Sequence, residues 1–232
     1  MGLASAAARG LAPLARRSAP RLTSGYVREI LERAIDGVGP FRGAARAADA
    51  KLVAAKGDVD TAIKALVDTH VRMAGIQGFV TNVGGLLTLA VSVPANITGL
   101  TVLNCHLVAG IAHLRGYDLA DPRVRNAVLV CLLGDDHVRA LVKQKKLPGG
   151  PMLLATSPVH DPQLDTLIGS HVTTQLLGKV GGRRMVSFVS RRVPVLGGGV
   201  GALSDAMSTQ SIASYAIAEL RDRRGGRTPA TA

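Results

Sequence analysis

Residues 73–114 read MAGIQGFVTNVGGLLTLAVSVPANITGLTVLNCHLVAGIAHL and contain no Asp, Glu, Lys or Arg. Arg72 and Arg115 close the two ends of this charge-free stretch. Its length accommodates two helices of about 20 residues each. The pair Gly84-Gly85 and Pro94 interrupt it, which predicts a helical hairpin. Hydropathy leaves two interpretations open: a buried hairpin at the centre of a soluble bundle, or a hairpin that enters a membrane.

A second charge-poor segment, residues 193–218, reads VPVLGGGVGALSDAMSTQSIASYAIA and is interrupted only by Asp205. It weakly repeats the first segment, since IAHLR at 111–115 aligns with IAELR at 217–221. Both segments are rich in glycine and other small residues, which let helix backbones approach closely. We therefore expect the two Gly-rich segments to form helices that pack together.

The glycines at the start of the second segment also match a dinucleotide-binding turn. Gly197, Gly199 and Ala202 have the G-x-G-x-x-[G/A] spacing of that motif. Such a turn needs a preceding strand, which Pro194 disfavours. The acid at the expected distance, Glu219, falls within the same helical segment. The spacing thus favours a helix–helix contact over a phosphate site.

The remaining sequence is also helical. Asp58, Asp121 and Asp161 precede apolar periodic segments and are predicted N-caps, the last two each followed by proline. Gly116 has the place of a helix C-cap. An apolar stripe marks the first of these helices: Val59, Ile63, Leu66, Val67 and Val71. We predict an all-α fold.

The domain organisation follows from composition. Residues 1–25 are basic, contain no acidic residue and are predicted to be a disordered arm, with an organellar transit peptide as the alternative. Residues 26–222 are predicted to form a single compact helical domain, and residues 223–232 a disordered tail. Aromatic residues make up 3% of the chain and Trp is absent, so the core must consist of small aliphatic side chains.

The formal net charge of +12 suggests a negatively charged partner. Few aromatic residues and no RNA- or DNA-binding motif argue against specific nucleic-acid binding. A candidate contact with an anionic surface flanks the second Gly-rich segment: Arg183, Arg184, Arg191 and Arg192. An anionic lipid surface attracts such charges by about 1 kcal/mol each. A solvated basic loop is the alternative.

Four polar residues within the charge-poor segments are candidates for a ligand-binding or structural cluster: Asn96, Asn104, Asp205 and Gln210. Asp205 is the most unusual because it is a lone acid in an apolar helix. It either forms a structural ion pair, for which Arg191 or Arg192 could serve, or acts as a functional carboxylate.

The sequence contains few signs of a metal site or of a catalytic site. His106 and His113 are two helical turns apart and cannot hold one ion alone. Cys105 and Cys131 lie in apolar runs typical of buried free thiols. No G-x-S-x-G motif is present. We predict no metal, cofactor or catalytic residue, and favour a non-enzyme without excluding an undescribed enzyme.

Three motifs together resemble the EcsC protein family: GFVTNVGGLLTLAVSVPANI at 78–97, AHLRGYDLADPRV at 112–124 and RRVPVLGGGVGALSD at 191–205. The resemblance spans about residues 58–220. It implies a helical domain widespread in bacteria and sometimes encoded beside an ABC transporter, without an agreed activity. Asn96 stands where the family commonly has Asp, so a role that needs that carboxylate is not expected here.

Two functions are therefore expected. The first is a non-enzymatic cytoplasmic protein, peripheral or inserted at the inner face of the cell membrane, that binds an anionic membrane or a membrane complex such as a transporter. The second is a soluble helical domain that encloses an apolar, lipid-like ligand.

Overall fold

The computed structural model describes residues 24–38, 41–83, 89–189 and 194–223. The arm predicted over residues 1–25 therefore lies almost wholly outside the described residues, as does most of the predicted tail. The described chain is α-helical as predicted, except for two strands of two residues each that pair antiparallel, β1 (Gly37–Val38) and β2 (Phe41–Arg42). The helices are α2 (Ser24–Asp36), α3 (Ala44–Ala54), α4 (Val59–Val83), α5 (Leu89–Leu114), α6 (Pro122–Leu133), α7 (Asp135–Lys143), α8 (Pro151–Thr156), α9 (Pro162–Val189) and α10 (Pro194–Glu219).

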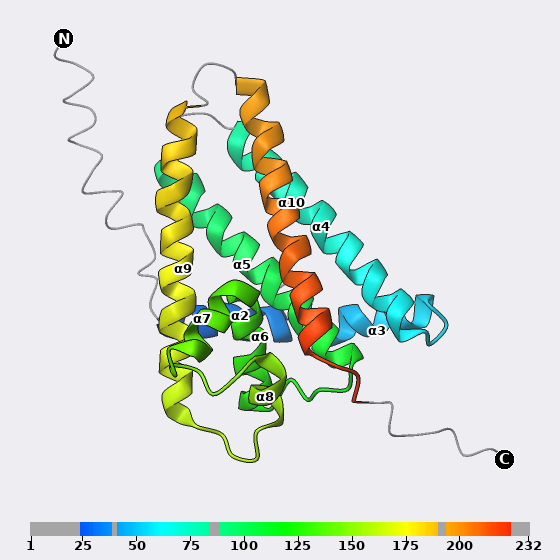
Figure 1. Cartoon of the computed structure of the whole chain (residues 1–232). Coiled ribbons are helices and arrows are strands. Elements are labelled where there is room, and N and C mark those ends of the chain that lie inside the picture. Colours follow the sequence, from blue (N-terminus) through cyan, green and yellow to red (C-terminus); the bar gives the residue numbers. More distant parts are fainter. Residues whose placement is uncertain (1–23, 39–40, 84–88, 190–193, 224–232) are drawn as a thin grey trace, which may run out of the picture.

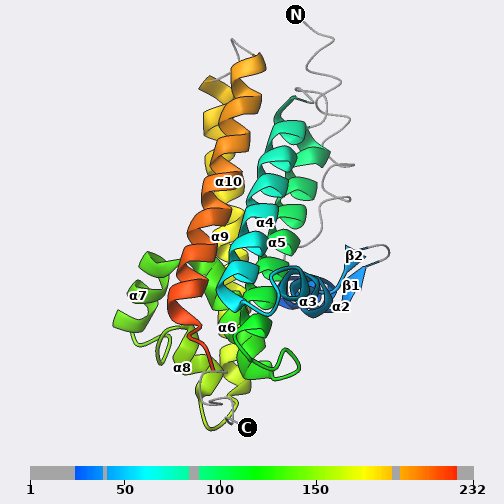
Figure 2. The ribbon, with the colours of Figure 1, turned by 90° about the vertical axis from the view of Figure 1, so that its right-hand side faces the viewer.

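The four longest helices, α4, α5, α9 and α10, run along the length of the molecule (Figure 1). The shorter helices gather around the lower half of this bundle in the same view. In both Figure 1 and Figure 2, the end of α4, the start of α5, the end of α9 and the start of α10 lie at the same upper end. We call these parts the upper end of the bundle.

The core formed by the described side chains lies in the lower half and consists mainly of Leu, Val, Ile and Ala, as the composition predicted. Its centre is formed by the second half of α5 together with α6, where Leu107, Ile111, Val128 and Leu129 are fully buried. The second half of the predicted hairpin is therefore part of a protein core. Among the described residues, no helix has the length and apolar character needed to cross a membrane.

The helix termini match the sequence predictions. Asp58 accepts a hydrogen bond from the Thr61 backbone N–H at 2.6 Å, and Asp121 and Asp161 cap α6 and α9 through backbone N–H groups two residues on. Gly116 follows α5 with a positive φ of 83°, which a glycine adopts without strain. The predicted apolar stripe of α4 is buried or packed against the core.

Candidate functional site

The predicted contact between Gly-rich segments is found between α10 and the C-terminal half of α4. A Cβ atom placed on Gly78 would lie 2.6 Å from the Gly201 carbonyl oxygen and 2.8 Å from the Asp205 Oδ2 atom. One turn earlier, a Cβ on Gly75 would lie 3.7 Å from the Ala202 carbonyl oxygen. Both segments thus contribute to the contact, although Gly84 and Gly85, which had suggested it, lie outside the described residues. The helix α10 also packs on α5.

The dinucleotide-like glycines belong to the same helix. Gly197, Gly199 and Ala202 all lie inside α10, which begins at Pro194. A dinucleotide-binding turn requires them to form a loop between a strand and a helix. The helical conformation therefore excludes that use of the spacing here.

The four predicted polar residues do not all come together. Asn104 and Asp205 are buried, Gln210 is exposed, and the side chain of Asn96 lies outside the described ones. Gln210 therefore does not join a buried cluster. Thr209, one turn beyond Asp205 on the same face of α10, is fully buried and was not predicted. The four candidate arginines also lie outside the described side chains, so their predicted role stays a prediction.

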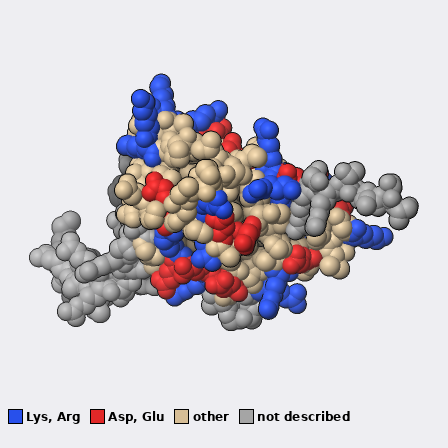
Figure 3. All heavy atoms as spheres, turned by 90° about the horizontal axis from the view of Figure 1, so that it is seen from below, with Lys and Arg blue, Asp and Glu red and all other residues tan. Residues whose placement is uncertain are grey.

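Charge is distributed unevenly along the bundle. Seen from below, the lower end carries many Lys, Arg, Asp and Glu side chains (Figure 3). Residues 73–83, which form the upper part of α4, and the whole of α5 contain no Lys, Arg, Asp or Glu. From its start to residue 218, α10 contains one charged residue, Asp205, whose side chain is fully buried.

The described part of this uncharged surface exposes apolar side chains. Ile76 and Leu203 are each 65% exposed, and Met73 and Met207 are exposed as well. By the rise of an α-helix, Ile76 lies about 10 Å from the end of α4 and Leu203 about 14 Å from the start of α10. These exposed residues were not predicted from the sequence. They lie on the faces of α4 and α10 away from the buried Gly78 and Asp205.

The pockets of the described part of the chain include two whose linings contain charged residues. One, of about 640 Å³, is lined by residues of α2, α3 and the turn after α5, with Asp36, Arg46, His113 and Asp118 among them. The other, of about 430 Å³, includes Lys145 and Lys146. Charged linings suit a polar ligand better than a lipid-like one. Neither pocket contains Asn104, Asp205 or Gln210, so these pockets give no support to an apolar-ligand site at the predicted cluster.

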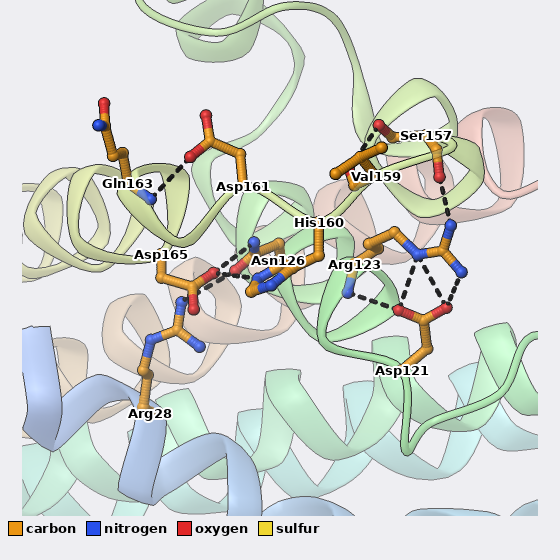
Figure 4. A network of polar contacts seen from close by, with 10 residues as sticks. All are labelled: Arg28, Asp121, Arg123, Asn126, Ser157, Val159, His160, Asp161, Gln163 and Asp165. Carbon is orange, nitrogen blue, oxygen red and sulfur yellow. Dashed lines mark hydrogen bonds and ion pairs between the residues drawn. The ribbon is translucent and has the colours of Figure 1, made fainter.

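A polar network not predicted from the sequence joins α2, α6 and α9 around Asp165 (Figure 4). The Asp165 Oδ1 atom receives hydrogen bonds from Asn126 at 2.7 Å and His160 at 3.0 Å, and an ion pair from Arg28 at 3.0 Å. Arg28 also donates to the buried Asn126 side chain. Burial opposes ionisation, but these partners outweigh it and hold the pKa of Asp165 below its usual value.

Beside this network, Arg123 holds Asp121 through both carboxylate oxygens and donates to the Ser157 carbonyl oxygen. These hydrogen bonds lower the pKa of Asp121. The pairing of His160 with Asp165 resembles part of a catalytic triad, but the hydroxyl of Ser157 donates to the Val159 carbonyl oxygen instead. The contacts of the network join α2, α6 and α9.

The two cysteines are free and buried, as predicted. Burial raises the pKa of Cys105 to about 12 and also raises that of Cys131, so both thiols are protonated and unreactive at neutral pH. Within the described residues, no three His, Cys, Asp or Glu side chains are grouped to hold a metal ion.

No family model, no curated protein and no solved structure matches this chain.

Proposed function

We propose that this is a non-enzymatic, EcsC-like protein that associates with the cytoplasmic face of a membrane through the upper end of its helical bundle. The observation that carries the proposal is the exposed apolar surface that α4 and α10 present toward the upper end. The upper halves of α4 and α10 expose Ile76, Leu203 and Met207 without an exposed charge between them, whereas the lower end is densely charged (Figure 3). Water disfavours such an apolar surface, and a lipid interface accepts it.

The dimensions suit insertion into one leaflet. The hydrocarbon core of a bilayer is about 30 Å thick, so one leaflet provides about 15 Å. Ile76 and Leu203 lie about 10 and 14 Å from the ends of their helices, inside that depth. On α4 the first charged residue below Ile76 is Arg72, and on α10 no charged residue other than the buried Asp205 precedes Glu219. Met207, which is also exposed on α10, lies about 20 Å from the start of that helix and therefore just below this depth.

The basic residues that precede α10 in the sequence supply the second attraction. Arg183 and Arg184 belong to the last two turns of α9, and Arg191 and Arg192 lie between α9 and α10 in the sequence. Anionic headgroups attract each such charge by about 1 kcal/mol. The resemblance to the EcsC family, which is sometimes encoded beside a membrane transporter, agrees with this location.

A fluorescence experiment tests the proposal. Ile76→Cys and Leu203→Cys each carry an environment-sensitive dye, and Val53→Cys, an apolar residue of α3 that is 79% exposed, is the matched control. The buried Cys105 and Cys131 should not react with the dye. With vesicles that contain phosphatidylserine, we expect blue-shifted emission at positions 76 and 203 and none at position 53. Unchanged emission at all three positions, or an equal shift at all three, would contradict the proposal.

The arginines are tested by charge reversal. The double substitution Arg183→Glu/Arg184→Glu should weaken sedimentation with anionic vesicles about tenfold or more. Lys64→Glu/Lys143→Glu makes the same change of net charge at exposed positions of α4 and α7 and should have little effect. Equal losses in both variants would indicate a general charge effect and would contradict a specific role of the upper end.

A further inference from the structure

Two histidines form a row of polar contacts that crosses three elements. The His70 Nδ1 atom of α4 lies 2.8 Å from the Leu66 carbonyl oxygen, and its Nε2 atom lies 2.9 Å from the His106 Nδ1 atom of α5. The His106 Nε2 atom lies 3.1 Å from the carbonyl oxygen of Arg42 in β2. The row therefore runs from a carbonyl oxygen through two imidazoles to a second carbonyl oxygen.

The space between the imidazoles fits a proton and not a metal ion. The ring centroids are 5.1 Å apart and the planes differ by 27°, so with nitrogens at 2.9 Å the rings meet end to end. A metal ion on that line, with bonds of about 2.0–2.1 Å to each nitrogen, would need a separation of about 4 Å. The observed separation is that of a hydrogen bond.

The number of hydrogen atoms on the two ring systems decides how many contacts of the row can form. Both ends are carbonyl oxygens, which only accept, so the three contacts need three N–H groups from the two rings. Two neutral imidazoles carry one N–H each and can supply only two. One contact is therefore lost while both rings are neutral, and one additional proton from solvent completes all three.

The contact that is lost in the neutral pair is the one to β2. His70 is nearly fully buried, so its contacts to Leu66 and His106 cannot be replaced by water. His106 is more accessible, and water can reach its Nε2 atom and the Arg42 carbonyl oxygen. In the neutral state both rings therefore carry their proton on Nδ1, and the His106 Nε2 lone pair faces that oxygen.

We propose that His70 and His106 form a proton-operated link between α4, α5 and the β1–β2 hairpin. Uptake of one proton at His106 Nε2 allows this atom to donate a hydrogen bond to the Arg42 carbonyl oxygen. This hydrogen bond connects β2 to α5. Release of that proton leaves a lone pair against the carbonyl oxygen and loosens the contact. Because β1 and β2 join α2 to α3, the link makes the position of this connection sensitive to pH.

The surroundings set the pH range of the link. Burial lowers the pKa of His70 to about 4 and also lowers that of His106, while the hydrogen bond to Arg42 raises the pKa of His106. The charged residues that face the pair are Lys51 of α3, whose charge lowers the pKa of His70, and Arg42, whose side chain is exposed. The proton is therefore taken up first by His106, in acid rather than at neutral pH.

Nuclear magnetic resonance of the histidine-labelled full chain tests the link directly. At pH 7.5 we expect both rings neutral with the proton on Nδ1. On acidification, one proton should enter at His106, and the backbone amide of Gly43, which shares a peptide unit with the Arg42 carbonyl, should shift with the same midpoint. A neutral His106 with its proton on Nε2, or uptake of the first proton at His70, would overturn the proposal.

Substitutions supply the matched comparison. In His106→Gln the pH-dependent shift of the Gly43 amide should disappear. In His113→Gln, two turns further along α5 and paired with Asp49, the shift should remain. Persistence of the shift in His106→Gln, or its loss in both variants, would overturn the link. The tautomers of the unaltered protein decide the question if His106→Gln does not fold.

Discussion

Gly78 of α4 touches Asp205 of α10 so closely that a side chain at position 78 would overlap the Asp205 carboxylate, at 2.8 Å, and the Gly201 carbonyl oxygen, at 2.6 Å. A backbone oxygen cannot move aside without shifting α10. We therefore predict that Gly78→Ala lowers the free energy of unfolding by about 1–3 kcal/mol, although alanine favours helices by about 1 kcal/mol over glycine. Urea denaturation of the two proteins measures the difference.

Gly75→Ala is the control for this prediction. At Gly75 the nearest atoms would be at 3.7 and 3.8 Å, an ordinary contact distance. The substitution should therefore be neutral or stabilise the helix by up to about 1 kcal/mol. If both substitutions destabilise the protein equally, close approach at Gly78 is not the cause.

This contact was predicted from the sequence only in part. Absence of charge and abundance of glycine predicted two close-packed helical segments, because both properties act along the chain. These two properties could not identify α4 as the main partner of α10. That choice depends on which faces of α4, α5 and α10 pack together in the folded protein. Of the two polar candidates on α10, Asp205 is buried and Gln210 is exposed, because an amide in an apolar helix can equally face solvent.

A second prediction concerns the network around Asp165. Asp165→Ala removes the acceptor shared by Arg28, Asn126 and His160 and leaves the buried amide of Asn126 without its partner. We expect a loss of about 2 kcal/mol in the free energy of unfolding. Asp136→Ala removes a fully exposed carboxylate 3.4 Å from Arg139 and should cost less than about 0.5 kcal/mol. Similar losses in both variants would contradict a connecting role.

No local pattern could have predicted this network. Its members come from α2, α6, α9 and the loop before α9, which are separated in the sequence, and each looks like an ordinary surface residue in its own segment. The same applies to His70 and His106, which are 36 residues apart. Helix termini were predicted well because a cap residue and the N–H group it binds are neighbours in the chain.

A third prediction is the effect of pH on stability. The pKa of His70 is lowered from 6.5 in the unfolded chain to about 4, because burial disfavours the charged ring. A pKa that is lower in the folded than in the unfolded chain favours the folded state above pH 6.5. This contribution to the free energy of unfolding is lost as the pH falls toward 4. The loss amounts to about 3 kcal/mol for a shift of this size.

Thermal or urea unfolding between pH 4 and 7.5 measures this dependence. His70→Gln cannot take up the proton, so its stability should decline less steeply over this range than that of the unaltered protein. Carboxylates with lowered pKa, such as Asp165, contribute equally in both proteins and cancel in the comparison. Parallel pH profiles would exclude His70 as the source.

The final prediction separates membrane binding from folding. Ile76→Glu and Leu203→Glu place a charge on exposed surface, so neither should change the free energy of unfolding by more than about 0.5 kcal/mol. Insertion of either carboxylate into the leaflet costs several kcal/mol, so sedimentation with vesicles should fall at least tenfold. Val53→Glu makes the same chemical change at an exposed position of α3 and should leave vesicle binding within about twofold. Retained binding in both upper-end variants would show that the apolar surface of α4 and α10 does not enter the lipid, because a buried carboxylate cannot be accommodated there without loss of affinity.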